Sequence, residues 1–368
     1  MRVLIVPDKF KGTLTARQAA EAMAVGWREG RPEDELHLLP MSDGGDGFGE
    51  IIGELLDAVP IRTDAVNAAH EPVEVLWWWS PEKNTAIVES ARAIGLAMLP
   101  KGKHHPFELD TLGLGILLQR IAAEHPGTKL IVGIGGSATN DGGFGMARGL
   151  GFRFLAADGA DIEQWTQLDK LDRIVPARPL ALASLTIATD VANPLLGPEG
   201  ASRIYGPQKG LRPSDYDAAE RCLANLSQKV KRDLGVDAER APGAGAAGGL
   251  GYGLRVFLNG AFEPGFDIFS RLSGLRSQIE NVDFVLTGEG SIDAQTQMGK
   301  GTGAVAQLAR ELGKPCLGLA GLVSARSGVF AQVHAIVPDL AHAEEAMARP
   351  GDWVRELSRR TAEGFHPD

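Results

Sequence analysis

The sequence predicts an α/β protein with two domains. Several short, wholly apolar segments are each followed by a polar loop and then by a segment with helical spacing of its apolar residues; Val3–Val6 and Asp283–Leu286 begin two such units. Continuous apolar runs of this length are typical of parallel strands, which are covered on both faces. The pattern stops near residue 66 and resumes near Asp283, and 368 residues are enough for two domains.

The first forty residues alternate strand and helix. Val3–Val6 precedes a helix expected over 16–28, where Thr15 is the predicted N-cap and Gln18 completes a capping box. A second strand, Leu36–Leu39, leads into a loop rich in Gly and Asp. This is a βαβα beginning, and both strand ends carry charged, glycine-containing loops.

The middle of the chain begins with a different pattern. Three strand-like segments with short turns predict an antiparallel meander over 61–67, 73–79 and 86–89, in which we attribute the three consecutive tryptophans to strand packing. The remaining elements expected are a helix whose apolar face is Ile51, Ile52, Leu55 and Leu56, helices over 109–123, 215–234, 266–279, 302–312 and 353–362, and strands over 129–133, 186–188, 315–319 and 334–337.

Composition narrows the class of protein. A net charge of −10 argues against nucleic acid or an anionic membrane as the main partner. The two cysteines give no disulfide framework, which fits a reducing cytoplasm. No apolar run approaches the ~20 residues of a membrane span, and the apolar run near the N-terminus is expected to be the first strand rather than a signal peptide. We therefore expect a cytoplasmic protein, with no membrane and no nucleic acid as partners.

Charged and polar side chains gather in the loops that follow predicted strands, where open α/β sheets bind ligands. Phosphoryl transfer needs cationic groups for phosphate, acids for Mg²⁺ and a group that orients or deprotonates the accepting hydroxyl. The loops supply all three, in Lys9, Lys11, Asp43, Asp46, Ser137, Asn140, Asp190, Lys209, Glu289, Asp293, Thr296 and Lys300. The chain lacks the Walker A and protein-kinase signatures, so these residues permit a kinase without requiring one.

Two other classes of function stay open. Gly133 begins a G-x-G-x-x-A match after a predicted strand, with Asp158 and Asp161 at roughly the spacing of a dinucleotide-binding fingerprint, which would predict an NAD(P)-dependent oxidoreductase. Against it, residues 137–141 are polar where the fingerprint has helix-packing residues. The third class is a two-domain protein that closes on a small acid. The small-residue stretch 242–249 predicts close packing on either a neighbouring backbone or a ligand.

The order of motifs along the chain resembles the glycerate kinase family, bacterial enzymes that phosphorylate D-glycerate with ATP. The resemblance lies in eight ordered blocks that span nearly the whole chain: PDKFKGTLTA (7–16), PMSDGGDG (40–47), ESARAIGL (89–96), GIGGSATNDGG (133–143), ATDVANPLLGPEGAS (188–202), YGPQKG (205–210), PGAGAAGG (242–249) and TGEGSIDAQT with GK (287–300). Ser42 and Asp46 depart from the family's more usual Ala and Glu, and LDTLGLGILL replaces its usual glycine pattern around 110–118.

The resemblance implies a fold and an activity. The fold is a flavodoxin-like or Rossmann-like discontinuous domain, residues 1–66 plus 260–368, with a second α/β domain, 67–259, inserted into it and the active site in the cleft between them. The activity is ATP-dependent phosphorylation of D-glycerate, with 2-phosphoglycerate as the usual product and Mg²⁺ as cofactor. Glycerate and ATP are then the small-molecule partners, and a homo-oligomer stays possible.

We assign roles to the site residues from the family motifs together with the chemistry of each side chain. Asp190 is the first choice for orienting or deprotonating the glycerate hydroxyl, with Asp293 as the alternative; Lys9 and Lys300 complete the catalytic set. The other assignments are substrate binding by Lys11, Ser42, Asp43, Gly44, Gly45, Asn193 and Lys209, nucleotide binding by Gly135, Gly136, Ser137, Asn140, Glu289 and Thr296, and Mg²⁺ binding by Asp43, Asp46, Glu289 and Asp293.

Overall fold

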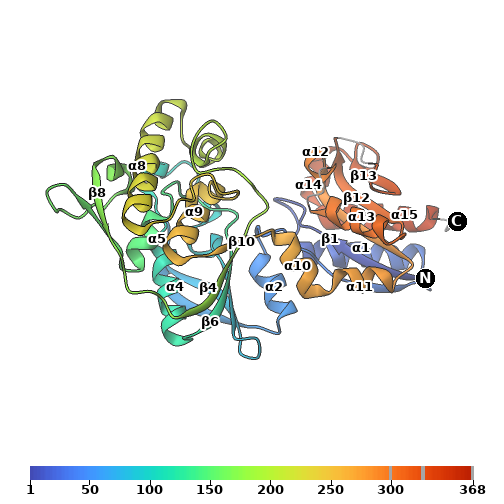
Figure 1. Cartoon of the computed structure of the whole chain (residues 1–368). Helices are drawn as coiled ribbons and strands as arrows, with labels where there is room; N and C mark the ends of the chain where they lie inside the picture. The colour runs from blue at the N-terminus through green and yellow to red at the C-terminus, as the bar shows by residue number, and fades with distance from the viewer. Residues whose placement is uncertain (298–300, 325–327, 366–368) are drawn as a thin grey trace. The chain divides into compact units, whose positions relative to one another are not determined.

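The chain folds into two compact units, of which the first is discontinuous in sequence. The computed structural model describes residues 1–297, 301–324 and 328–365. Unit 1 comprises Met1–Asp43 and Phe266–Asp368, and unit 2 is Gly44–Gly265. In unit 1 the blue N-terminal elements lie beside the orange and red C-terminal ones (Figure 1).

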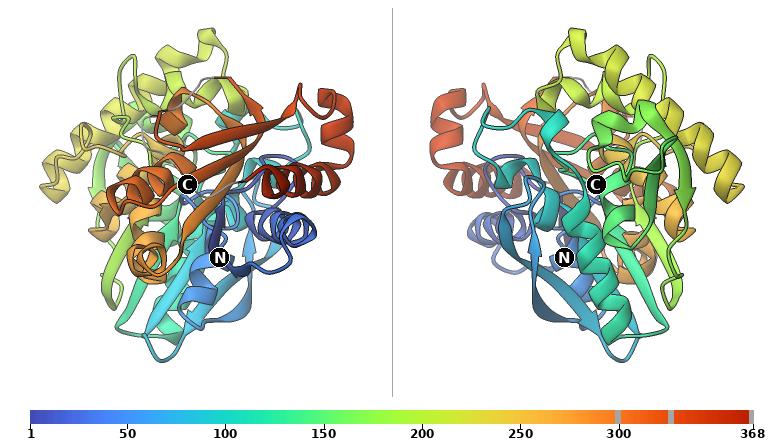
Figure 2. Two further views of the ribbon diagram at one scale, coloured as in Figure 1. Left: turned by 90° about the vertical axis from the view of Figure 1, so that its right-hand side faces the viewer. Right: turned by 90° about the vertical axis from the view of Figure 1, so that its left-hand side faces the viewer.

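The sheet of unit 1 is entirely parallel. Its order is β13-β12-β11-β1-β2, and its strands are β1 (Arg2–Pro7), β2 (Glu35–Leu38), β11 (Phe284–Ile292), β12 (Cys316–Val323) and β13 (Gln332–Val337). Counted along the unit, this is the order 2-1-3-4-5 of flavodoxin-like sheets, in which the direction of winding reverses between the first and third strands. Here those strands are β1 and β11 (Figure 2).

Individual residues explain where helices of unit 1 begin, pack closely and break. The Thr15–Gln18 capping box is present at the start of α1, as predicted. Gly26 of α1 lets the backbone of α15 approach, since a Cβ there would lie 2.0 Å from the Arg355 carbonyl oxygen. The helix expected over 266–279 is two helices, because Gly274 has a φ of +63° and interrupts the helical path. The helices are α1 (Ala16–Gly30), α10 (Gly265–Ser273), α11 (Leu275–Glu280), α12 (Ala294–Gln297), α13 (Thr302–Glu311), α14 (Ala343–Ala348) and α15 (Pro350–Gly364).

Unit 2 contains a six-stranded mixed sheet with the order β10-β9-β6-β5-β4-β3. The predicted meander is confirmed, because β3–β4 and β4–β5 pair antiparallel, whereas β5, β6, β9 and β10 pair parallel. The strands are β3 (Val59–Val66), β4 (Pro72–Ser80), β5 (Thr85–Glu89), β6 (Thr128–Gly133), β9 (Leu182–Ala188) and β10 (Ala261–Glu263). A separate hairpin-like pair, β7 (Arg153–Ala156) with β8 (Leu171–Val175), was not predicted.

The helices of unit 2 cover this sheet and pack on one large core that includes Trp77, Phe144 and Trp165. The α-helices are α2 (Phe48–Leu55), α3 (Ala91–Ile94), α4 (Leu112–Glu124), α5 (Phe144–Gly149), α6 (Ala201–Ile204), α7 (Gly206–Lys209), α8 (Tyr216–Leu234) and α9 (Ala246–Leu258), and the 3₁₀ turns are η1 (Leu96–Met98), η2 (Pro106–Glu108), η3 (Trp165–Lys170) and η4 (Pro213–Asp215).

The first crossing between the units lies at Asp43–Gly44, earlier than the residue 66 expected from the sequence. Two contacts explain the difference. β3 pairs along its whole length with β4, and α2 lies on the Trp78 ring so closely that a Cβ on Gly49 would be 2.1 Å from it. The second crossing lies at Gly265–Phe266, near the expected residue 260. The α/β class is confirmed, with a parallel sheet in unit 1 and a mixed sheet in unit 2. Among the helices of the described residues, none has the length and apolar character of a membrane span.

Candidate active site

The carboxyl ends of β1 and β11 bring three acidic side chains to one edge of the unit 1 sheet. Asp8 follows β1 directly, and its backbone N–H donates to the Gly288 carbonyl of β11 at 2.9 Å, next to Glu289. The loop after β2 reaches the same edge, because the Met41 N–H donates to the carbonyl of the last residue of β1 at 2.9 Å, and this loop continues to Asp43. This edge is the reversal point of the sheet, where doubly wound folds bind their ligands.

Lys9 lies between two of these carboxylates. Its ammonium is 3.2 Å from Asp43 Oδ1 and 3.8 Å from Asp8 Oδ1. Asp8 is buried, and burial, followed by the charge of Asp43, raises the pKa of Asp8 to about 7, although Lys9 opposes the shift. Asp8 was missing from the residues predicted for the site. The available signals were its place at the end of the first strand and in the block PDKFKGTLTA (7–16).

Glu289 is held by two hydroxyl groups. Its carboxylate accepts hydrogen bonds from Thr296 Oγ1 at 2.9 Å and from Thr302 Oγ1. Burial raises the pKa of Glu289, and these hydroxyls oppose the shift. Asp293 exchanges weak hydrogen bonds of 3.3 and 3.4 Å with Thr296 at the start of α12. Glu289, Asp293 and Thr296 therefore lie together, whereas Lys300 lies outside the described residues.

Lys11 and Ser42 occupy opposite environments in unit 1. The Lys11 residue is exposed, and Gly290 of β11 leaves room for its backbone, since a Cβ on Gly290 would lie 3.3 Å from the Lys11 nitrogen. Ser42 is buried, and its hydroxyl makes no hydrogen bond within the described part of the chain. A buried hydroxyl without a partner is a group that a ligand or an ordered water can satisfy.

In unit 2, two glycine-rich loops that are far apart in sequence lie against each other. A Cβ on Gly135 would be 2.8 Å from Gly45 Cα, and one on Gly136 would be 2.9 Å from Asp46 Oδ1. The Gly135 N–H also points to the Gly44 carbonyl at 3.4 Å. Side chains at 135 and 136 would therefore separate the loops, and five of the predicted site residues come together here.

Glu89 fixes the first of these loops. The buried carboxylate accepts from the Gly47 N–H at 3.1 Å and from the Gly49 N–H at 3.3 Å, at the start of α2. Arg92 lies 3.3 Å from the same carboxylate and 5.0 Å above the Trp78 ring. Glu89 is absent from the residues predicted for the site, although it ends a strand and begins the block ESARAIGL (89–96).

The loop after β6 carries a cluster of buried polar groups. Lys209 ends α7, and its ammonium donates to Ser137 Oγ at 2.9 Å and to the Thr139 carbonyl at 2.7 Å. Asn140 donates from Nδ2 to Ser202 Oγ at 2.9 Å. Thr139 Oγ1 and Asn140 Oδ1 are buried and make no hydrogen bond in the described residues. The cluster therefore has acceptors and a hydroxyl left for a ligand or water.

Asp141 closes the same loop with a buried carboxylate. It accepts from the Thr111 N–H at 2.9 Å, the Thr111 hydroxyl at 2.7 Å, the Gly143 N–H at 3.2 Å and the Gly145 N–H at 2.8 Å. Burial, followed by the charge of Asp110, raises the pKa of Asp141 to about 6. Burial lowers the pKa of Lys209 to about 7, and the charge of Asp141 opposes that shift.

Asp190 and Asn193 follow β9, whose end pairs with the end of β6. Asp190 is half-buried. Asn193 links parts of its own loop: its Oδ1 accepts a hydrogen bond from the Tyr205 hydroxyl at 2.6 Å, and its Nδ2 donates to the Glu199 carbonyl at 2.8 Å. The parallel pairing brings Asp190 to the same sheet edge as the loop that begins at Gly133.

The small-residue stretch 242–249 packs on neighbouring backbone, the first of the two interpretations left open. A Cβ on Gly248 would lie 1.9 Å from the Thr139 carbonyl oxygen, and one on Gly249 would lie 2.8 Å from Gly142 Cα. Ala247 takes a left-handed φ of +55° immediately before them. The stretch therefore supports the loop after β6 from behind.

The dinucleotide interpretation of that loop finds no support in its geometry. The helix that follows, α5, begins only at Phe144 and has six residues, whereas a dinucleotide fingerprint opens its helix inside the glycine motif. Among the described residues, no three His, Cys, Asp or Glu side chains are grouped so that they could hold a metal ion by themselves. Mg²⁺ commonly takes only one or two carboxylates together with substrate phosphates.

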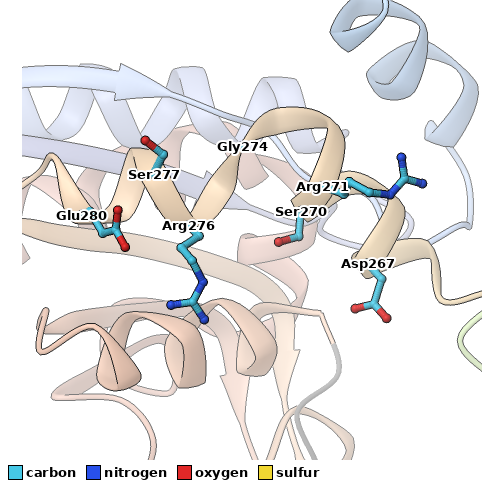
Figure 3. A pocket seen from close by; sticks show the side chains of 7 residues that line it. All are labelled: Asp267, Ser270, Arg271, Gly274, Arg276, Ser277 and Glu280. Carbon is cyan, nitrogen blue, oxygen red and sulfur yellow. The ribbon is translucent and has the colours of Figure 1, made fainter.

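A surface hollow on unit 1 lies elsewhere. It has a volume of about 470 Å³ and is lined by residues of α10 and α11: Asp267, Ser270, Arg271, Gly274, Arg276, Ser277 and Glu280 (Figure 3). None of the residues predicted for the site lines it. Its charges are balanced, and Arg276 is already 3.6 Å from Glu311, so we assign it no ligand.

Comparison with known proteins gives one consistent result. A family model described as the glycerate kinase family matches residues 3–366. A glycerate kinase of Halalkalibacterium halodurans is 35% identical over 370 residues, with 98% of this chain and 97% of the relative covered. A glycerate 2-kinase of Escherichia coli K12 is 34% identical with the same coverage. The crystal structure of a protein provisionally named glycerate kinase 2, from Salmonella typhimurium LT2, matches with a TM-score of 0.83 and 33% identity over 98% of this chain and 97% of that one.

Proposed function

Because this chain belongs to the glycerate kinase family, and is therefore a kinase, we propose that it transfers the γ-phosphoryl group of ATP to D-glycerate and releases 2-phosphoglycerate and ADP. A hydroxyl oxygen of glycerate forms the new bond to phosphorus while the bond to the bridging oxygen of ADP breaks. The proton of that hydroxyl is accepted by a carboxylate. The name of the Escherichia coli relative supports the 2-position.

The observation that carries the proposal is the edge of the unit 1 sheet at β1 and β11. Asp8, Asp43 and Glu289 stand there with the ammonium of Lys9, at the place where flavodoxin-like sheets bind ligands. A cation and several acids at one strand edge match the needs of a nucleotide with its metal. We assign Lys9 to phosphate, and Lys11 and Lys300 remain proposed for phosphate or for the glycerate carboxylate.

Asp190 remains the proposed acceptor of the glycerate proton. It follows β9 at the sheet edge that also carries the loop beginning at Gly133. Gly135, Gly136, Ser137 and Asn140 on that loop are proposed to bind phosphate through N–H and side-chain groups. The hydrogen bonds of Asn193 to its own loop favour a supporting role for it over direct substrate contact.

The side chains present fit Mg²⁺, a hard cation that prefers carboxylate oxygens. We propose Asp43 and Glu289 as its protein ligands, with Asp46 and Asp293 as the alternatives. When bound, Mg²⁺ neutralises charge on the nucleotide phosphates. The cytoplasm remains the proposed compartment, and both cysteines, Cys222 and Cys316, are free and buried.

The test is an assay of ADP release with MgATP and a series of small hydroxy acids, in which the product is identified by phosphorus NMR. We expect turnover with D-glycerate and a single 2-phospho product. A 3-phospho product would correct the position, and turnover only with another acid would replace the substrate. Stabilisation by NADH without ATP turnover would favour the oxidoreductase, and binding of glycerate without turnover would favour a small-acid-binding protein.

A further inference from the structure

The loop Gly133–Gly143, which follows β6, is held in shape by two buried charges of opposite sign. Lys209 fastens its middle through Ser137 Oγ and the Thr139 carbonyl. Asp141 fastens its end through the backbone N–H groups of Gly143 and Gly145. Both anchors come from within unit 2, and neither requires a bound ligand.

Lys209 is more buried, and its ammonium more fully hydrogen-bonded, than is expected of a lysine that binds a substrate. The residue is only 6% exposed, and two of its three N–H groups are already donated to the loop at 2.7 and 2.9 Å. A buried ammonium is costly unless it is hydrogen-bonded and faces an opposite charge. Here the loop supplies the acceptors, and the charge of Asp141 favours the protonated amine against the effect of burial.

The same loop is the one whose polar groups are left for a ligand. Thr139 Oγ1 and Asn140 Oδ1 are fully buried without a hydrogen bond in the described residues. In the sequence, Thr139 and Asn140 lie between Ser137, which accepts a hydrogen bond from Lys209, and Asp141. A binding loop that is fixed before its ligand arrives loses less entropy on binding and in the transition state.

We infer that Lys209 is a positioning residue for the phosphoryl transfer: its ammonium holds the loop Gly133–Gly143 in its binding shape through Ser137 and Thr139, without touching glycerate or the nucleotide. This replaces its predicted role as a substrate contact. The kinetic part of the inference rests on the proposed function, whereas the structural part can be measured on the protein alone.

The structural experiment is hydrogen exchange of peptides covering 133–143, without substrates, in Lys209→Met and in a matched control. Methionine keeps the length and loses the donors. Since the variant loses two hydrogen bonds from a charged group to the loop, exchange in this loop should accelerate about tenfold or more. The control is Lys229→Met, because Lys229 is a partly buried lysine of the same unit, 3.5 Å from Asp172, and its loss should leave 133–143 unchanged.

The kinetic experiment separates positioning from contact. Lys209→Met should lower kcat about 10–100-fold, leave KM for glycerate little changed, and raise KM for ATP only together with faster exchange in 133–143. Ser137→Ala removes one acceptor of the ammonium; because Ser137 is itself proposed to bind phosphate, the effect of this variant is measured by exchange in 133–143 and not by kcat. A variant with wild-type exchange in 133–143 but a raised KM would make Lys209 a substrate contact and overturn the inference.

Two further outcomes remain informative. If Lys209→Met does not fold, Ser137→Ala alone should still accelerate exchange in 133–143, and unchanged exchange in that variant would refute the inference. If no hydroxy acid is phosphorylated by the wild type, the proposed function fails, but the exchange result still decides whether Lys209 holds the loop.

Discussion

Asp8→Asn should make unit 1 more stable at pH 8 while it lowers the activity. The pKa of Asp8 is raised from 3.8 to about 7 by burial and by the charge of Asp43. The folded protein therefore binds a proton that the unfolded chain releases between pH 4 and 7, so the contribution of Asp8 to the unfolding free energy falls as pH rises through this range and is constant above it. Asparagine has no such proton.

The size follows from one pKa unit being worth 1.36 kcal/mol. Between pH 5 and pH 8 the stability of the variant, relative to wild type, should rise by about 1.5–3 kcal/mol. The assay is a urea titration in EDTA at pH 5 and another at pH 8. Unfolding is monitored by hydrogen exchange in peptides from β1 and β11, so that only unit 1 is observed.

Asp283→Asn is the matched control in the same unit. A hydrogen bond from the Arg2 backbone lowers the pKa of Asp283. The stabilising contribution of Asp283 is therefore present at pH 8 and is lost in acid. Asp283→Asn should accordingly lower the stability at pH 8, where Asp8→Asn raises it. A pH-independent difference between Asp8→Asn and wild type would refute the electrostatic reasoning. Unchanged kcat would remove Asp8 from the active site.

Three further variants test separate parts of the site. Asp190→Asn should reduce kcat about 10²–10⁴-fold with little change in melting temperature if it accepts the glycerate proton; Asp293→Asn, measured beside it by the same ADP-release assay, reverses the assignment if it alone is inactive. Glu89→Gln should cost about 1–3 kcal/mol of stability in thermal unfolding, because one backbone N–H that donates to the carboxylate would then face the side-chain NH₂ group of glutamine. An unchanged melting temperature would show that Glu89 does not anchor this loop. Gly135→Ala should cost about 1–3 kcal/mol and lower activity, since its Cβ would meet backbone at 2.8 Å, whereas Gly364→Ala, where the space is open, should be neutral in the same unfolding assay.

The sequence predicted the features that depend on local pattern. The apolar run Val3–Val6 and the Thr15 capping box depend on neighbours within one element, the meander depends on strands joined by short turns, and all are present. Gly135 and Gly136 were assigned to the site from their motif, and the structure adds the reason for glycine, which is contact with a loop some ninety residues earlier.

What could not be predicted depends on burial and on distant contacts. Asp8 resembles a loop carboxylate in sequence, and only its burial beside β11 sets it apart. The motif of Lys209 predicts a substrate contact, and the motif does not reveal that its ammonium already donates to two acceptors on the loop after β6. The helical pattern of α2 does not reveal that its glycines pack on Trp78, a contact within unit 2.

The pairing of β1 with β11 has a consequence for how the protein is made. The two strands are joined by hydrogen bonds between residues about 281 positions apart, so the sheet of unit 1 cannot be completed until the last part of the chain has left the ribosome. At about 5–20 residues per second, β1 waits roughly 15–55 s for its partner. Unit 2 is continuous and can fold in this interval, while β1, with its apolar run, presents an unpaired edge of the kind that recruits other chains. Newly made chains are therefore most vulnerable to aggregation during this wait, and early binding of a chaperone to the first forty residues would protect them.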